Sequence, residues 1–184
     1  MLLDMYKTML SIRAFETKAA ECFTKGMLAG NIHLCIGQEA VPTGACYALE
    51  PEDYMTSTHR GHGHCIAKGA SLDKMLAELF GKKTGYCQGK GGSMHIADVA
   101  GLHSLGANGI VGAGIPIAAG SALVSKIKGD KHVTLCFFGD SASNHLYERG
   151  RSRAAGPHRA GAAPPQPGRT RQHTFSLLPE PVYL

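Results

Sequence analysis

A carboxylate at the end of a short apolar run is the first candidate for chemistry. The run from His132 to Phe138 has the length of a buried strand, and it ends at Gly139 and Asp140. Such a carboxylate can hold Mg²⁺ against a diphosphate, because magnesium prefers hard oxygen ligands. The small residues that follow, beginning with Ser141, would let backbone N–H groups approach a phosphate. Gly-Asp pairs are also common in simple turns, so the pattern alone leaves both interpretations open.

Histidines are concentrated in a second segment. His59, Arg60, His62 and His64 fall within six residues. The spacing is compatible with a metal site, but no acidic residue follows closely and Arg60 would lie beside the cation. We therefore favour a loop that presents Arg60 to a phosphate and imidazoles to a substrate carbonyl or carboxylate. A solvated polar loop is the alternative.

A glycine-rich run, GKGGSMH from Gly89 to His95, contains one lysine. It could cradle a phosphate, but it lacks the spacing of a Walker loop, and no strand directly precedes it as a dinucleotide-binding fingerprint requires. A flexible loop is an equally good interpretation. The run lies within a polar stretch, 85–114, with few periodic signals, and long loops in compact domains are usually functional or disordered.

Helices are predicted on both sides of these segments. Helical spacing of apolar residues or a run of small residues predicts them over 1–25, 40–49, 71–80 and 116–128, with Ser71 as a candidate N-cap. A loop, a small-residue helix, a buried strand and Gly-Asp at its carboxyl end form an α/β pattern. In open parallel sheets, ligands bind at that end. We predict an α/β fold with a parallel sheet flanked by helices.

Composition divides the chain into two parts. The 184 residues carry a net charge of +5, and the apolar share of 43% is ordinary for a globular protein. Residues 1–144 contain eleven Lys and two Arg, whereas residues 145–184 contain six Arg, no Lys and six of the nine Pro. The second part has no apolar period, so we predict a domain over 1–144 and a disordered tail over 145–184. Our hypothesis is a frameshift near codons 141–145, and a genuine short variant is the alternative.

Several classes of protein are disfavoured. The six cysteines form no CxxC pair, which favours free thiols in a reducing compartment over a disulfide framework or a zinc ribbon. No apolar run approaches 18 residues, and charges are spread through the first twenty, which argues against a transmembrane helix or a secretory signal. We expect a soluble protein of the bacterial cytoplasm, with the mitochondrial matrix as the alternative. Arginines of the tail could contact nucleic acid, but few aromatics are interleaved, so we predict neither nucleic acid nor membrane as a partner.

Five motifs, in order, resemble a single family: HLCIGQEA (33–40), THRGHGH (58–64), GKGGSMHIAD (89–98), LGANGIVGAGIP (105–116) and FFGDSASN (137–144). Over residues 1–144 the chain is similar to alpha subunits of the thiamine-diphosphate-dependent first component of 2-oxo acid dehydrogenases. The motif sequences are most similar to those of the pyruvate and acetoin dehydrogenase branches. The resemblance implies a thiamine-diphosphate-binding fold, with thiamine diphosphate and Mg²⁺ as cofactors.

The resemblance also implies roles for residues at the cofactor. Asp140 matches the metal-ligating aspartate of the family's Gly-Asp-Gly motif, so Gly139 and Ser141 are expected to bind the cofactor beside it. Arg60 matches the arginine that contacts the diphosphate, and His59 stands where many relatives have tyrosine.

Four further residues are assigned in the same way. Gly109 and Val111 match positions whose backbone meets the aminopyrimidine ring. His33 matches a histidine near the 2-oxo acid, and His62 lies in the segment of Arg60, so both are predicted catalytic residues.

The implied activity needs partners. In this family the acyl or hydroxyalkyl group passes to the lipoyl carrier of an acyltransferase component, and a beta subunit supplies the glutamate that activates the cofactor. The chain departs from the family at Ser141, where glycine is expected, and no asparagine after Asn144 provides the second side-chain ligand for Mg²⁺. We therefore expect weak or absent cofactor binding by this polypeptide alone. The alternative function is that of a non-catalytic remnant that at most binds the beta subunit.

Overall fold

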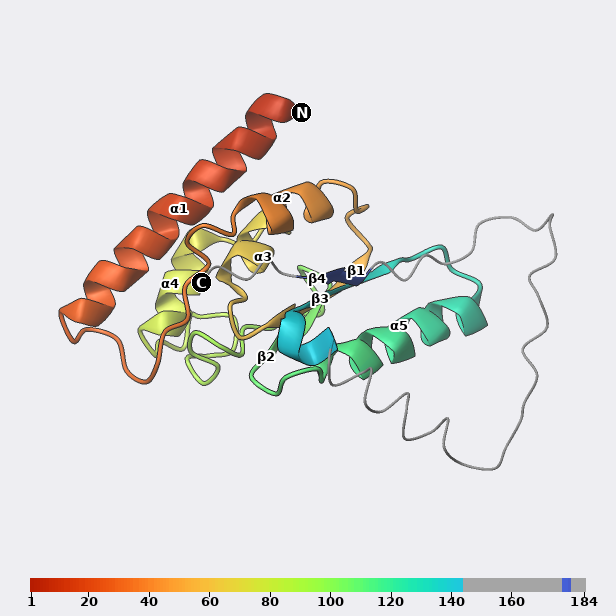
Figure 1. The fold of residues 1–184 in the computed structure, drawn as a ribbon. Coiled ribbons are helices and arrows are strands. Elements are labelled where there is room, and N and C mark those ends of the chain that lie inside the picture. The colour runs from red at the N-terminus through yellow and green to blue at the C-terminus, as the bar shows by residue number, and fades with distance from the viewer. Residues whose placement is uncertain (144–176, 180–184) are drawn as a thin grey trace.

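The computed structural model describes residues 1–143 and 177–179, which form one parallel sheet with helices on both faces (Figure 1). Along the chain the elements are α1 (Leu2–Thr24), α2 (Ala40–Cys46), β1 (Tyr54–Thr58), α3 (His62–Ala67), α4 (Leu72–Leu79), β2 (Ser104–Asn108), α5 (Gly114–Lys128), β3 (Thr134–Phe138) and β4 (Leu177–Pro179). The predicted α/β class is confirmed.

The sheet has four parallel strands in the order β2-β1-β3-β4. Strand β3 is buried along its whole length, as expected of a strand covered on both faces. Its side chains alternate between two apolar clusters. Leu135 and Phe137 join the core with residues of α1, α3 and α4, whereas Cys136 and Phe138 join Ile115 of α5. Helix α5 therefore covers one face, and the N-terminal helices cover the other (Figure 1).

Two predicted loops contain regular structure. The stretch 85–114 includes strand β2, which pairs in parallel with β1 between Met55 and Ser104, so the prediction of a loop was wrong there. The sequence SLGAN is short and interrupted by glycine, and its pairing depends on β1 rather than on a local pattern. The segment after Arg60 also departs from the prediction, because α3 begins at His62.

Helix boundaries shift by a few residues. Helix α2 ends at Cys46, short of the predicted limit at residue 49. Ser71 precedes α4 with extended backbone angles, but its side chain makes no capping hydrogen bond. Its backbone N–H instead donates to the Tyr86 hydroxyl at 2.8 Å.

One short segment of the predicted tail is described. Leu177–Pro179 pairs in parallel with β3. An unpaired strand edge presents free N–H and C=O groups, and an edge strand tolerates proline. The prediction of disorder for the tail stays a prediction. The rest of the tail, and the part of the proposed frameshift site beyond residue 143, lie outside the described residues.

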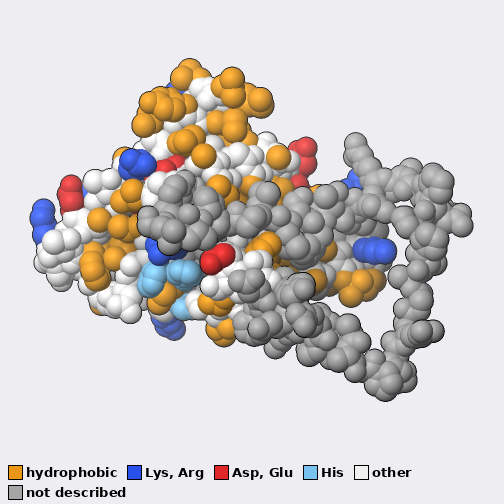
Figure 2. Space-filling model, in the orientation of Figure 1, with side chains coloured by type: hydrophobic (Ala, Val, Ile, Leu, Met, Phe, Trp, Pro, Cys, Tyr) orange, Lys and Arg blue, Asp and Glu red, His pale blue; other side chains and the backbone are white. Residues whose placement is uncertain are grey.

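Helix α1 is anchored unequally along its length. Ile12 and Phe15 in its middle are buried in the core. Its first turns project beyond the other helices, and hydrophobic side chains gather there, with Leu2 77% and Tyr6 58% exposed (Figures 1 and 2). Among the described helices, none combines the length and apolar character that crossing a bilayer requires.

Candidate functional site

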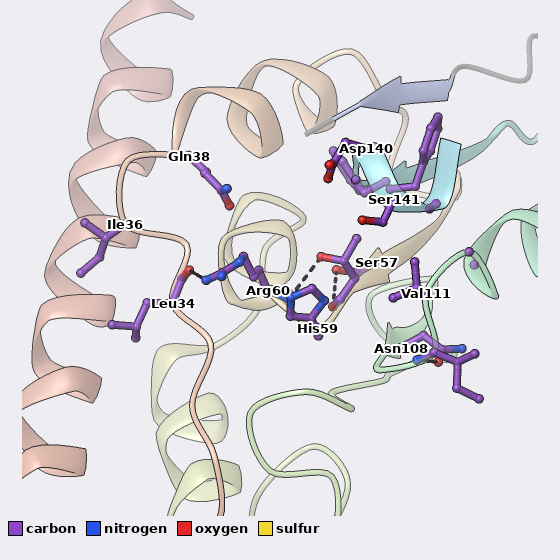
Figure 3. A pocket seen from close by; sticks show the side chains of 18 residues that line it. Leu34, Ile36, Gln38, Ser57, His59, Arg60, Asn108, Val111, Asp140 and Ser141 are labelled. Carbon is purple, nitrogen blue, oxygen red and sulfur yellow. Dashed lines mark hydrogen bonds between the residues drawn. The ribbon is translucent and has the colours of Figure 1, made fainter. Parts of the chain in front are cut away.

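A cavity of about 400 Å³ opens at the carboxyl ends of three strands (Figure 3). Ser57 and Thr58 end β1, Asn108 ends β2, and Phe138 ends β3; all four line the cavity. The chain leaves β1 for β2 on one side and returns to β3 on the other. The cavity therefore lies where the strand order reverses, which is the usual ligand position in open parallel sheets.

Most residues predicted to bind a cofactor line this one cavity, and they come from three separate segments: His59, Arg60, Val111, Gly139, Asp140 and Ser141. Gly109 lies between two lining residues, Asn108 and Ile110, but is not itself in the wall. The predicted catalytic residues His33 and His62 are also absent from the wall.

Arg60 places a cation at one side of the cavity. Its Nη1 donates to the Leu34 carbonyl at 2.9 Å, and its backbone N–H donates to the Thr58 hydroxyl at 3.2 Å (Figure 3). A guanidinium has five N–H donors, so one bond to Leu34 orients the group and leaves further donors for an anion. Leu34, like Ile36 and Gln38, lines the cavity from a segment that the sequence analysis did not assign to the cofactor.

Asp140 places a carboxylate across the cavity from Arg60 (Figure 3). It follows β3 at the start of a helical turn, and the Ser143 hydroxyl donates to its backbone carbonyl at 2.6 Å. Asp140 is the one carboxylate among the described lining residues, and none of the described residues forms an ion pair with it. The side chain is thus available to a ligand.

These residues fit one half of a metal–diphosphate site. Mg²⁺ is commonly held by one or two side-chain oxygens, with phosphate oxygens and water completing the octahedron. Asp140 is such a ligand, but no group of three or more His, Cys, Asp or Glu forms elsewhere among the described residues. Space for a phosphate exists at Gly139, where a Cβ would meet nothing within 4 Å.

Two imidazoles stand beside Arg60. The His59 ring meets the His33 ring edge-on, with centroids 5.0 Å apart. Burial lowers the pKa of His59, and the neighbouring His33 and Arg60 lower it further. His59 is therefore neutral at pH 7 and can offer a donor and an acceptor to the cavity, with His33 behind it.

Ser57 is a lining residue that the sequence analysis missed. Its Oγ lies 2.7 Å from His64 Nδ1, and the His64 ring stacks on Phe137 with centroids 3.8 Å apart. Burial, followed by the charge of nearby His62, lowers the pKa of His64 to about 3. A neutral, fully buried imidazole thus fixes the Ser57 hydroxyl at the cavity wall. No pattern marked Ser57, because it lies inside a strand that was not predicted.

His62 points away from the cavity. It is fully buried in α3, and its Nδ1 and Nε2 lie 2.9 Å from Glu16 Oε2 and 3.0 Å from Ser93 Oγ. The proposed active-site loop is therefore split between a cavity-lining part, His59 and Arg60, and a helix whose histidines face the core.

The glycine-rich run after Gly85 encloses an anion that the chain itself supplies. The buried Glu78 carboxylate accepts hydrogen bonds from the backbone N–H groups of Cys87, Gly89, Gly91 and Gly92 at 2.7–3.2 Å. A Cβ at Gly89, whose φ is +77°, would stand 2.3 Å from the carbonyl carbon of Gly81. The proposed phosphate cradle is thus occupied by Glu78.

Comparison with known proteins agrees with this geometry. Residues 6–148 match the family model described as dehydrogenase E1 component. The chain is 60% identical over 140 residues to the alpha subunit of acetoin:2,6-dichlorophenolindophenol oxidoreductase from Bacillus subtilis, covering 76% of this chain and 42% of that protein. It is 49% identical over 143 residues to the same subunit from Cupriavidus necator, covering 78% and 43%.

A third relative comes from the pyruvate branch. The chain is 44% identical over 151 residues to the pyruvate dehydrogenase E1 component subunit alpha of Porphyra purpurea, covering 78% of this chain and 44% of that protein. The chain thus spans less than half the length of the curated relatives it matches. Because the family match covers most of the chain and includes every wall of the cavity, the chain belongs to the dehydrogenase E1 component family.

Proposed function

We propose that this chain forms the N-terminal part of the alpha subunit of a thiamine-diphosphate-dependent dehydrogenase that acts on acetoin or pyruvate. The observation that carries the proposal is the cavity in which Arg60 and Asp140 face each other at the strand ends. A cation and a carboxylate across one cavity suit a diphosphate bound together with a divalent metal ion.

Each wall has a part in binding. Arg60, held by Leu34, would bind the diphosphate oxygens, while Asp140 would ligate Mg²⁺ beside Gly139 and Ser141. Val111 and its neighbour Gly109 would meet the aminopyrimidine ring with their backbone groups. When bound, thiamine diphosphate would supply a carbanion nucleophile and an electron sink for cleavage at the substrate carbonyl.

The polar groups beside Arg60 would serve the substrate. Neutral His59, with His33 behind it, can donate a hydrogen bond to a carbonyl oxygen or accept a proton from a substrate hydroxyl. Leu34, Ile36 and Val111 add apolar side chains to the lining of the cavity. The Bacillus subtilis relative favours acetoin as the substrate, and the Porphyra purpurea relative favours pyruvate.

The reaction would be completed by partners. We propose that a beta subunit supplies the catalytic glutamate, and that a lipoyl-bearing acyltransferase component accepts the acyl or hydroxyalkyl group. The cavity lining supports this need for a partner. Among the described lining residues Asp140 is the one carboxylate, so no lining glutamate is there to activate the cofactor. We place the complex in the bacterial cytoplasm.

Calorimetric titration tests the proposal. Thiamine diphosphate with Mg²⁺ is titrated into the 184-residue chain alone and into the chain co-expressed with a beta subunit. We expect weak or absent binding to the chain alone. In the presence of the beta subunit we expect measurable binding that needs Mg²⁺ and is lost in Asp140→Asn and Arg60→Ala. Asp130→Asn, an acidic residue outside the cavity, is the matched control and should bind as the unmodified chain does. Binding that ignores both Mg²⁺ and Asp140 would overturn the proposed site.

A second candidate function is binding of the beta subunit without turnover. Asp140 as the lone described carboxylate at the cavity favours it, since a metal site with one side-chain ligand is weak. Co-purification of the chain with a beta subunit, in the absence of acetoin- or pyruvate-dependent turnover, would select this candidate.

A further inference from the structure

A buried hydrogen-bonded chain links helix α1 to the loop that holds Arg60. Glu16 Oε2 lies 2.9 Å from His62 Nδ1, and His62 Nε2 lies 3.0 Å from Ser93 Oγ. Glu16 and His62 are fully buried, and Ser93 is 7% exposed. None of the three lines the cavity, so the proposed binding chemistry does not use them directly.

We call Glu16, His62 and Ser93 the relay. Its two ends, Ser93 and Glu16, hydrogen-bond to the same short segment, residues 33–35. Ser93 Oγ accepts the His33 N–H at 3.2 Å, and Glu16 Oε1 accepts the Cys35 N–H at 2.9 Å. The residue between these two donors is Leu34, whose carbonyl accepts the hydrogen bond from Arg60. In an extended segment the N–H groups of alternate residues point to one side, and the C=O group of the residue between them points to the other. Hydrogen bonds that hold the His33 and Cys35 N–H groups therefore direct the Leu34 carbonyl to the opposite side, toward Arg60.

Every polar atom of the three side chains has a partner. The Glu16 carboxylate pairs with His62 Nδ1 through one oxygen and accepts the Cys35 N–H through the other. Ser93 Oγ pairs with His62 Nε2 and accepts the His33 N–H. Removing one member therefore leaves a buried partner unpaired.

We infer that the Glu16–His62–Ser93 relay positions Arg60 for its anion by fixing the Leu34 carbonyl from behind. The three residues are positioning residues, because they act through Leu34 and touch no part of the cavity. The same segment carries His33, whose ring meets the His59 ring edge-on, so the relay also helps to position His59. The inference rests on the proposed function only in naming the anion as a diphosphate.

The test compares Ser93→Ala with two controls in the 184-residue chain. Ser93→Thr keeps the hydroxyl. Ser104→Ala removes a hydroxyl that is more deeply buried but has no hydrogen-bond partner among the described residues. Nuclear magnetic resonance of the Arg60 guanidinium, assigned with Arg60→Lys, reports whether its rotation is restrained. We expect restrained Arg60 signals in the unmodified chain, Ser93→Thr and Ser104→Ala, and averaged signals in Ser93→Ala.

Titration with inorganic pyrophosphate gives the second readout. We expect Ser93→Ala to weaken pyrophosphate binding about fivefold, and to have no further effect in an Arg60→Ala background, because residues joined in one hydrogen-bond network couple. A purely structural relay would lower the melting temperature of Ser93→Ala while leaving the Arg60 signals and the affinity unchanged, and that result overturns the inference. If no variant binds pyrophosphate, the proposed function fails and the Arg60 signals alone decide. Ser93→Cys, a weaker hydrogen-bonding group, replaces Ser93→Ala if the latter does not fold.

Discussion

Two regions of this molecule combine glycine-rich backbone with a charged side chain, and they use it differently. The loop from Cys87 to Gly92 wraps the buried Glu78 carboxylate with four backbone N–H groups. The cavity at the strand ends is lined by both Arg60 and Gly139, and no carboxylate of the described residues pairs with that arginine. The first region carries its own anion and stabilises the fold. The second keeps its cation available, which is the property of a binding site.

The largest expected effect concerns the loop around the Glu78 carboxylate. Glu78→Ala would leave four part-buried N–H donors without their acceptor. A buried unsatisfied donor costs about 1–3 kcal/mol, and partial contact with water reduces that cost, so we expect a total loss of about 2–4 kcal/mol in the free energy of unfolding, measured by urea denaturation. Glu21→Gln, which removes an exposed ion pair with Lys18, should leave it nearly unchanged. Equal midpoints for both variants would show that Glu78 does not hold the loop.

Removing the Arg60 cation from the cavity should affect anion binding rather than folding. Arg60→Ala is expected to weaken pyrophosphate binding about 30-fold, since a hydrogen bond to a charged group is worth about 2 kcal/mol. Lys83→Ala removes an exposed charge outside the cavity and should leave affinity unchanged. Similar losses in both variants would mean that the anion responds to net charge and not to this site.

One wall of the cavity, at Leu34, depends on close packing of Gly63 in α3 against the neighbouring Cys35. A Cβ at Gly63 would stand 2.7 Å from Cys35 Sγ, so Gly63→Ala must displace the Cys35 side chain, next to Leu34. Overpacking of this kind costs about 1–2 kcal/mol, which urea denaturation can detect. Gly44→Ala in α2 has nothing within 4 Å of the new Cβ and should stabilise the chain slightly, because alanine favours helix. A destabilising Gly44→Ala would contradict the packing described for α2.

His64, buried and neutral behind the cavity wall at Ser57, should make the stability of the fold depend on pH. The pKa of His64 falls from 6.5 to about 3 on folding, so the unfolded chain binds the extra proton between these values. Stability is therefore full above about pH 6.5 and falls as the pH drops toward 3, by about 1 kcal/mol per unit near pH 5.5. His64→Gln should reduce this slope in unfolding measurements from pH 7.5 to 5, whereas His95→Gln, at an exposed position, should not. An unchanged slope in His64→Gln would assign the dependence to other groups.

The sequence predicted the charged residues of the site better than its walls. Asp140 and Arg60 were identifiable because each stands in a short segment whose neighbours are glycine, serine or histidine. Leu34 and Ser57 were not, because they reach the cavity through contacts between segments distant in sequence. The parallel α/β class followed from the helix–strand–Gly-Asp order, whereas β1 and β2 are short and lack a pattern of their own.

Side-chain direction was the second limit. His59 and His62 are three residues apart, and a loop would present both to one ligand. Because α3 begins at His62, that side chain and His64 turn into the core while His59 stays at the cavity. Glu78 was hidden for a similar reason, since an acidic residue on an amphipathic helix is normally solvated.

The unequal anchoring of α1 has a consequence for its motion. Amide protons of residues up to about Leu10 belong to turns with little tertiary contact, so they should exchange with deuterium soon after dilution. Those around Glu16 should exchange only when the whole domain opens, because Glu16 is tied to both α3 and Cys35. Limited digestion with trypsin should accordingly cut after Lys7 well before it cuts after Arg13.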